Sequence, residues 1–157
     1  RMARSGLSNV HPAQIAHERD DRVKRLAGKI DRVLVDAPCS GLGTLRRNPD
    51  LKWRQSPQSV AEMQVKQRAI LASAARLVRP GGRLVYATCS LLADENETVA
   101  DAFTAEGARD WAVLPAAEAL QAARVPQPDT LVDGPFMRLW PHRHGTDGFF
   151  AAAWVRR

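Results

Sequence analysis

The chain has 157 residues with a formal net charge of +6, and 45% of its residues are hydrophobic. That length allows one domain with a sizeable core, and no apolar run is long enough to cross a membrane. The N-terminal residues lack the apolar centre of a secretory signal, and two cysteines are too few for a disulfide scaffold. We therefore expect a soluble, cytoplasmic protein without a membrane partner, whose positive charge favours a polyanion such as RNA.

Residues 1–29 carry few signals. A helix is expected to end at Gly6, and residues 10–15 are expected to form a short strand that Pro12 interrupts. The strongly charged residues 16–29 are typical of a solvated loop or a short helix.

Two β-rich runs each end shortly before a cysteine. Residues 31–35 have the nearly continuous Val and Leu pattern of a parallel strand that is buried on both faces, and residues 83–88 form the second run. Cys39 follows the first run and Cys89 follows the second.

The segment between the two runs completes a βαβ unit. Apolar residues return at helical intervals over residues 59–78, Ser59 and Glu62 have the spacing of a capping box, and residues 79–82 turn the chain into the next strand. Such crossovers make the two strands parallel, and open α/β sheets bind ligands at the carboxyl ends of their strands. The two cysteines are therefore expected to face one crevice.

A long polar loop follows Cys39. It carries four cations around one tryptophan, a composition that suits phosphates and an unstacked base. The same composition is as common in loops that a tryptophan anchors for structural reasons alone. The residues are Arg46, Arg47, Lys52, Trp53 and Arg54.

The rest of the chain predicts two helices and a terminal hairpin. Asp94 and Glu97 have capping-box spacing at the start of a helix that Gly107 ends, so capping and the helix dipole account for the acidic cluster there. The predicted fold class is α/β, with a mostly parallel sheet and an antiparallel C-terminal hairpin. The remaining elements are a strand over 111–114, a helix over 116–124, a mobile loop over 126–135 and hairpin strands over 136–140 and 149–155.

A convergent pair of cysteines allows several interpretations. A disulfide is disfavoured in a reducing compartment, and a zinc site completed by His142 and His144 lacks closely spaced ligands. A cysteine phosphatase needs an arginine where Leu45 stands. Burial as structural residues is the default for a single cysteine, but it leaves the shared position at two strand ends unexplained. Nucleophilic chemistry remains.

Methylation of cytosine at carbon 5 is one such chemistry. A thiolate that adds to carbon 6 makes carbon 5 nucleophilic, and a nearby carboxyl group such as that of Asp36 can donate a proton at nitrogen 3. After methyl transfer the carbon 5 proton leaves and the thiol is expelled, steps that a second cysteine can assist. The residues alone do not say which cysteine attacks.

Several motifs resemble those of the RNA cytosine-5 methyltransferases, and most closely those of the bacterial 16S rRNA Sun/Fmu group. The resemblance implies a Rossmann-like class I methyltransferase fold, S-adenosylmethionine as cofactor and RNA, specifically 16S rRNA, as partner. The two cysteine motifs are residues 36–41 and 88–90, and the similarity continues over residues 46–53, 80–82, 95–97 and 146–150.

The resemblance also implies roles for single residues. Cys89 is the nucleophile that adds to cytosine, Cys39 assists product release, and Asp36 contacts the base and lies beside the methyl donor. Pro38 follows Asp36 in the same motif and is a candidate cofactor contact.

Two further sets of contacts are expected. The family's acid after its third strand has Glu18 or Asp20 as its candidate here, and we take Glu18 as a cofactor contact. The candidate RNA contacts are the cations of the polar loop, Arg46, Arg47 and Lys52.

The sequence departs from the family in its cofactor half. The glycine-rich loop after the family's first strand and the acid after its second have no counterpart, so residues 1–157 are expected to form the C-terminal part of a larger methyltransferase domain. Alone, these residues are expected to bind the methyl donor weakly or not at all and to be inactive. Two other classes stay open. One is an amino-methyltransferase of similar fold, in which an aromatic residue would stand in place of Cys39, and the other is a non-catalytic RNA-binding fragment.

Overall fold

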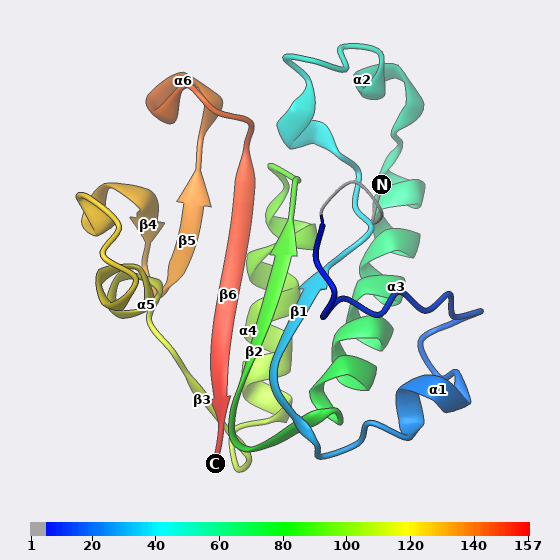
Figure 1. Ribbon diagram of the computed structural model, residues 1–157. Coiled ribbons are helices and arrows are strands. Elements are labelled where there is room, and N and C mark those ends of the chain that lie inside the picture. Colours follow the sequence, from blue (N-terminus) through cyan, green and yellow to red (C-terminus); the bar gives the residue numbers. More distant parts are fainter. Residues whose placement is uncertain (1–5) are drawn as a thin grey trace.

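The computed structural model describes residues 6–157, which form a single six-stranded sheet with helices packed on one face (Figure 1). The order of the strands is β1-β2-β6-β5-β4, and β3 pairs with one end of β6. The strands are β1 (Ile30–Asp36), β2 (Val78–Thr88), β3 (Trp111–Val113), β4 (Val132–Asp133), β5 (Phe136–Leu139) and β6 (Phe149–Arg156).

The helices differ greatly in length, and only α3 and α4 are long enough to cover the sheet. None of the helices in the described part of the chain is both long and apolar enough to span a bilayer. The α-helices are α1 (Asp21–Lys24), α2 (Leu51–Arg54), α3 (Pro57–Ala75), α4 (Glu97–Glu106), α5 (Ala116–Ala122) and α6 (Pro141–His144), and the short 3₁₀ turns are η2 (Leu42–Thr44), η3 (Ala93–Glu95) and η4 (Pro128–Leu131).

The predicted βαβ unit is confirmed. Strands β1 and β2 are parallel neighbours, with Val35 paired to Tyr86, and α3 connects them. Strand β2 pairs on its other side with β6, which is antiparallel to it, and β5 and β6 form the predicted antiparallel hairpin. The α/β class and the terminal hairpin were therefore readable from the sequence.

The core lies between the sheet and helices α3 and α4. Alternate side chains of β2 and β6 point toward these helices, because successive residues of a strand face opposite sides. The indole of Trp154 is fully buried beside Phe103, with 4.8 Å between ring centroids, and its Nε1 donates to Thr104 Oγ1 over 2.9 Å. The other fully buried large apolar side chains are Leu71, Val78, Leu84, Tyr86, Val99 and Phe150.

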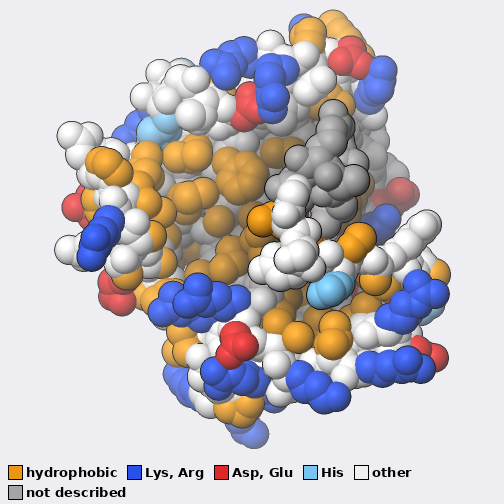
Figure 2. All heavy atoms as spheres, in the orientation of Figure 1, with side chains coloured by type: hydrophobic (Ala, Val, Ile, Leu, Met, Phe, Trp, Pro, Cys, Tyr) orange, Lys and Arg blue, Asp and Glu red, His pale blue; other side chains and the backbone are white. Residues whose placement is uncertain are grey.

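The expectation that the first strand is buried on both faces is wrong. Strand β1 lies at the edge of the sheet, and Leu34 is 69% exposed because its side chain points to the face that no helix of residues 6–157 covers. Figure 2 shows that uncovered face as a broad apolar area. The strand register places on it Leu34, Val85, Met137, Ala151 and Ala153.

The boundaries of α3 differ from the prediction at both ends. The capping box joins Ser56 and Ser59, three residues before the predicted one, because Pro57 occupies the first turn, where its missing N–H costs nothing. The helix ends at Ala75, and the Pro80-Gly81-Gly82 segment belongs to β2. A register shift between Ile30 and Arg32 accommodates that segment beside β1.

The predicted short elements had mixed outcomes. Residues 10–15 form no strand, since the segment has no strand to pair with, whereas α1 confirms a short helix within the charged region. The predicted loop 126–135 contains η4 and β4, and the connection between β5 and β6 contains α6. The helix expected to end at Gly6 lies outside the described residues, while β3, α5 and the end of α4 at Gly107 are confirmed.

Candidate active site

The two cysteines lie side by side just beyond the carboxyl ends of β1 and β2. Their Sγ atoms are 3.4 Å apart, and both side chains are only partly buried. The parallel pairing of the two strands brings their ends together, since Asp36 pairs with Ala87 in the last register step. The predicted convergence of the two thiols is confirmed. Neither cysteine lines the cavity described below, so a crevice that both thiols face stays a prediction.

A close backbone contact fixes the main chain of Cys89. Gly43 N donates to the carbonyl oxygen of Cys89 over 2.8 Å, and Gly148 N donates to Gly43 O over 2.8 Å. A Cβ at Gly43 would lie 2.6 Å from Cys89 O and would also collide with the Gly148 carbonyl. Glycine at position 43 therefore lets three chain segments meet: the η2 turn, the residue after β2 and the residue before β6.

Glu95 is a fully buried acid behind the cysteine pair, and its role was not anticipated. Its carboxylate accepts hydrogen bonds from Ser40, the residue after Cys39, and from Ser90, the residue after Cys89. The interpretation of residues 94–97 as capping residues is wrong here: Asp94 caps no helix, and the cap position of α4 is Asn96. The available signal was the repeated Cys-Ser pair, which places two hydroxyl donors at neighbouring strand ends.

Asn96 continues the same polar network. Its Oδ1 accepts from Thr88 Oγ1 over 2.5 Å, and its Nδ2 donates to Ser90 O over 3.0 Å. The phenol of Tyr86 donates to the carbonyl oxygen of Glu95 over 2.6 Å. The turn after β2 is thus hydrogen-bonded to the strand that precedes it.

The pair of thiols is asymmetric in its acidity. The hydrogen bond from Cys39 lowers the pKa of Cys89 to about 7, although burial and the charges of Asp36 and Glu95 oppose this. The same hydrogen bond, followed by burial, raises the pKa of Cys39 well above its ordinary value. Of the two thiols, Cys89 is therefore the one that ionises first as the pH rises, while Cys39 keeps its proton.

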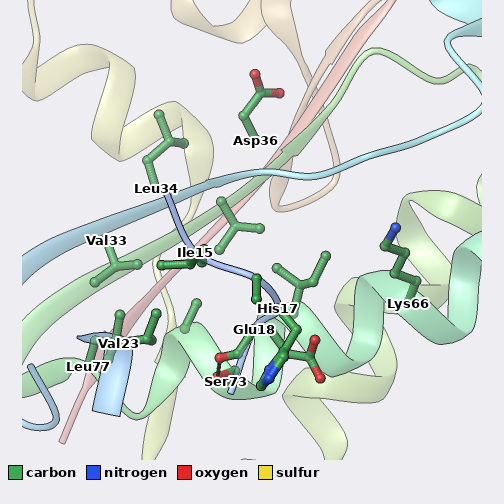
Figure 3. A pocket seen from close by; sticks show the side chains of 14 residues that line it. Ile15, His17, Glu18, Val23, Val33, Leu34, Asp36, Lys66, Ser73 and Leu77 are labelled. Atoms are coloured by element: carbon green, nitrogen blue, oxygen red, sulfur yellow. Dashed lines mark hydrogen bonds between the residues drawn. The ribbon is translucent and has the colours of Figure 1, made fainter. Parts of the chain in front are cut away.

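A cavity of about 650 Å³ lies between β1, α3 and the N-terminal segment (Figure 3). Asp36 lines it at the end of β1, and Glu18 lines it on the N-terminal segment. Ser73 Oγ of α3 donates a hydrogen bond to the carbonyl oxygen of Glu18 over 2.5 Å and so attaches this segment to the helix. Pro38 and the cysteines do not line the cavity, but Asp36 borders it and influences the pKa of Cys89. The remaining walls are mainly apolar and include Ile15, Leu34, Ile70 and Leu77.

The candidate RNA contacts divide into two groups. The guanidinium groups of Arg46 and Arg47 both pair with Asp147, and Arg46 Nη1 also donates to Gly145 O over 3.0 Å. These two arginines therefore join the polar loop to the connection between β5 and β6. Lys52 lies instead on α2, with its Nζ 4.8 Å from the ring centroid of Trp53, a residue that is 81% exposed.

The histidines of the zinc alternative lie in a structural hairpin. His144 Nδ1 accepts from Trp140 N over 2.8 Å, and its Nε2 contacts Thr130 O at 2.9 Å. Across residues 6–157 there is no group of three or more His, Cys, Asp or Glu side chains that could hold a metal ion. The structure brings Cys39 and Cys89 together without either histidine.

Comparison with known proteins gives one consistent result. The family model described as 16S rRNA methyltransferase RsmB/F matches residues 3–155. Ribosomal RNA small subunit methyltransferase B of Klebsiella pneumoniae is 40% identical over 129 residues, which cover 82% of this chain and 27% of that protein. Ribosomal RNA small subunit methyltransferase F of Escherichia coli is 37% identical over 153 residues, which cover 96% of this chain and 30% of that protein.

A solved structure agrees with these matches. NSun6 from Pyrococcus horikoshii with SFG superposes with a TM-score of 0.75 and 27% identity, over 99% of this chain and 36% of that one. The chain therefore has the Rossmann-like methyltransferase fold. It spans about three tenths of the length of the curated relatives that it matches.

Proposed function

The chain belongs to the 16S rRNA methyltransferase RsmB/F family, and on that premise we propose that it methylates carbon 5 of a cytosine in 16S rRNA through a covalent cysteine adduct, with S-adenosylmethionine as methyl donor. The observation that carries this proposal is the pair of thiols 3.4 Å apart at the carboxyl ends of two parallel strands, the first of which ends at Asp36. A single thiol suffices for attack on a base. A second thiol at this distance is explained by a reaction in which the covalent adduct must also be broken down to release the product.

Cys89 is the nucleophile in this proposal. Its pKa of about 7 makes the thiolate available near neutral pH, and the thiolate is the attacking form of cysteine. The sulfur adds to carbon 6 of cytosine, and the carbon 5 to carbon 6 double bond becomes an enamine-like system whose carbon 5 attacks a methyl group. A proton donated at nitrogen 3 by the Asp36 carboxyl group offsets the charge that develops on the ring.

Cys39 serves the second half of the reaction. After methylation the proton on carbon 5 passes to water, the electrons of that C–H bond form the double bond again, and the bond between carbon 6 and Cys89 Sγ breaks with its electrons on sulfur. Cys39 lies within hydrogen-bond distance of that sulfur, so it can exchange a proton with the departing thiolate. The target base has to leave its stack to reach the crevice, because carbon 6 is covered inside a helix.

The methyl donor fits the cavity beside Asp36. S-adenosylmethionine supplies the methyl group when bound. Its adenine suits the apolar walls formed by Ile15, Leu34 and Ile70, and the carboxylates of Glu18 and Asp36 suit its hydroxyl and ammonium groups. The SFG bound to the related NSun6 structure supports a ligand of this type. Pro38 does not line this cavity, so its contact with the methyl donor stays a prediction. Residues 1–157 form one part of the methyltransferase domain in this proposal.

Trapping the adduct tests the proposal. RNA that contains 5-fluorocytosine carries no removable proton on carbon 5, so the adduct with Cys89 persists after methyl transfer. In the full-length protein, with S-adenosylmethionine present, we expect a protein–RNA complex that survives denaturation when Cys89 is unsubstituted, and none in Cys89→Ala, as measured by gel electrophoresis and mass spectrometry of the linked peptide.

The second cysteine provides the matched variant. Cys39→Ala keeps the nucleophile, so with ordinary cytosine RNA it is expected to accumulate the adduct that the unsubstituted protein resolves. An amino-methyltransferase would form no adduct in any of these reactions, and an RNA-binding fragment would transfer no methyl group. Either result, obtained with protein that binds RNA, would overturn the proposed function.

A further inference from the structure

We propose that Glu95 is a positioning residue that holds Cys39 and Cys89 at their working separation, by binding the serine that follows each of them. This inference rests on the proposed function, in which both thiols act on one base. Glu95 itself touches neither sulfur. Its contacts are with the two turns on which the cysteines stand.

The contacts on the Cys39 side involve both oxygens of the carboxylate. Ser40 N donates to Glu95 Oε1 over 2.7 Å, and Ser40 Oγ donates to Oε2 over 2.5 Å. Gln67 of α3 donates from one Nε2 to Glu95 Oε1 over 3.1 Å and to Pro38 O over 2.9 Å. The residues before and after Cys39 are therefore tied to the same acid and to one helix.

The contacts on the Cys89 side converge on the same oxygen. Ser90 Oγ donates to Glu95 Oε2 over 2.5 Å, and the hydroxyls of Ser40 and Ser90 are 3.2 Å apart because they share this acceptor. Ser40, Ser90, Gln67 and Glu95 are all buried, so water does not supply alternative partners at low cost. Loss of the carboxylate leaves four donors without their acceptor: Ser40 N, Ser40 Oγ, Ser90 Oγ and Gln67 Nε2. The simplest way for these groups to find new partners is for the two cysteine-bearing turns to move apart.

Separation of the turns has a specific chemical consequence. The hydrogen bond from Cys39 is the main cause of the lowered pKa of Cys89, so a longer distance between the sulfurs raises that pKa toward 9. The charge of Glu95 acts in the opposite direction, because it raises the pKa of Cys89. Neutralising Glu95 therefore raises this pKa if Glu95 positions the thiols, and lowers it if Glu95 acts only as a nearby charge.

The test is the pH dependence of Cys89 alkylation by iodoacetamide, followed by mass spectrometry of the Cys89 peptide, in Glu95→Gln. We expect the midpoint to move from about pH 7 to about pH 8 or higher, which reduces the thiolate fraction at pH 7 from about one half to about one tenth or less. Ser40→Ala and Ser90→Ala keep the charge and remove one hydroxyl each, so they are expected to shift the midpoint in the same direction by less. These two variants also test the inference if Glu95→Gln does not fold.

Asp94→Asn is the matched control, because Asp94 is the exposed acid next to Glu95 and its side chain does not bind either serine. Its midpoint should equal that of the unsubstituted protein. Midpoints that stay near pH 7 or fall in folded Glu95→Gln, Ser40→Ala and Ser90→Ala would show that Glu95 does not position the thiols. Alkylation uses neither RNA nor methyl donor, so this result is independent of the trapping experiment, and failure of adduct formation would contradict the proposed function alone.

Discussion

The hydrogen bond between the two thiols decides which sulfur is ionised. The two sulfurs are 3.4 Å apart, and with Cys39 as the donor the pKa of Cys89 is lowered to about 7 while that of Cys39 is raised. A group with a lowered pKa is charged above that value, so the reactivity of Cys89 should increase as the pH rises through about 7 and then level off.

Removal of the donor should move this transition. In Cys39→Ala we expect the midpoint for alkylation of Cys89 to rise from about 7 toward the ordinary value of 9.0. The thiolate fraction at pH 7 would fall about 50-fold, but a more basic thiolate is also more nucleophilic, by up to about tenfold over such a shift. The midpoint, measured over pH 5 to about 10, is therefore a clearer observable than the rate at one pH.

Cys39→Ser is the control for this experiment. The serine hydroxyl can still donate to Cys89, so the midpoint should stay close to that of the unsubstituted protein. If Cys39→Ala and Cys39→Ser have the same midpoint as the unsubstituted protein, the acidity of Cys89 has another source and the hydrogen bond is not its cause.

Single residues of the site were predictable to different degrees. The convergence of Cys39 and Cys89 follows from two parallel strands that end together, and short-range pattern is enough to recognise it. The asymmetry between the thiols depends on a hydrogen bond across 50 residues of chain, and no local pattern encodes it. The acidic cluster around Glu95 was interpreted through capping and the helix dipole, because two of the actual partners of Glu95, Ser40 and Gln67, lie on distant segments of the chain.

Among the secondary-structure elements, the turn that contains Gly43 meets β2 and β6 with no space for a side chain. We expect Gly43→Ala to destabilise the protein by about 1–3 kcal/mol, the usual cost of overpacking, because the new Cβ would have to displace the carbonyl groups of Cys89 and Gly148. Urea unfolding measures this change. The alkylation midpoint of Cys89 should also shift, since the displaced carbonyl belongs to the reactive residue.

Gly134→Ala is the control for Gly43→Ala. Gly134 has a φ of +57° with no atom near an added Cβ, so alanine there costs only the strain of a left-handed backbone, about 1–2 kcal/mol. The midpoint of Cys89 should not change in this variant. A Gly43→Ala protein with unchanged stability and an unchanged midpoint would show that the turn moves freely.

The elements themselves were predicted well where local pattern determines them. Strands β1 and β2, helix α3 and the hairpin of β5 and β6 follow from apolar periodicity and turn residues. The exposure of β1 could not be predicted from these patterns, because an apolar residue such as Leu34 occurs on covered and on uncovered faces of a sheet. Only the arrangement of the strands shows that β1 lies at the edge and that Leu34 is exposed. The cap of α3 was misplaced since Ser56 and Ser59 are both plausible caps.

Over the whole molecule, charge and apolar surface are separated. The uncovered face of the sheet is apolar in Figure 2, whereas basic side chains surround it. The net charge of +6 was the basis for expecting a polyanionic partner, but composition does not say where that partner lies. Among the three candidate RNA contacts of the polar loop, Arg46 and Arg47 are already paired with Asp147. Lys52 instead lies against an exposed tryptophan, so it is the candidate whose contact with RNA we test.

If RNA binds along α2, Lys52 should contact a phosphate and Trp53 should stack on a base. Lys52→Gln is then expected to reduce the slope of the logarithm of RNA affinity against the logarithm of salt concentration by about 0.7–0.9, as for one lost phosphate contact. Trp53→Ala is expected to weaken binding by about 1–3 kcal/mol at every salt concentration, because a lost stacking contact releases no counterions. Fluorescence anisotropy with labelled RNA over a range of salt measures both effects.

Lys24→Gln separates a local contact from the effect of total charge. It removes the same charge as Lys52→Gln, but Lys24 lies on α1, at the far end of the molecule from α2 in Figure 1, and it pairs with Asp21 at 2.8 Å. A phosphate contact at α2 predicts that the salt dependence changes for Lys52→Gln and stays the same for Lys24→Gln. Equal changes in the two variants would mean that RNA responds to the net charge of the molecule, and Lys52 would then have no special place in binding.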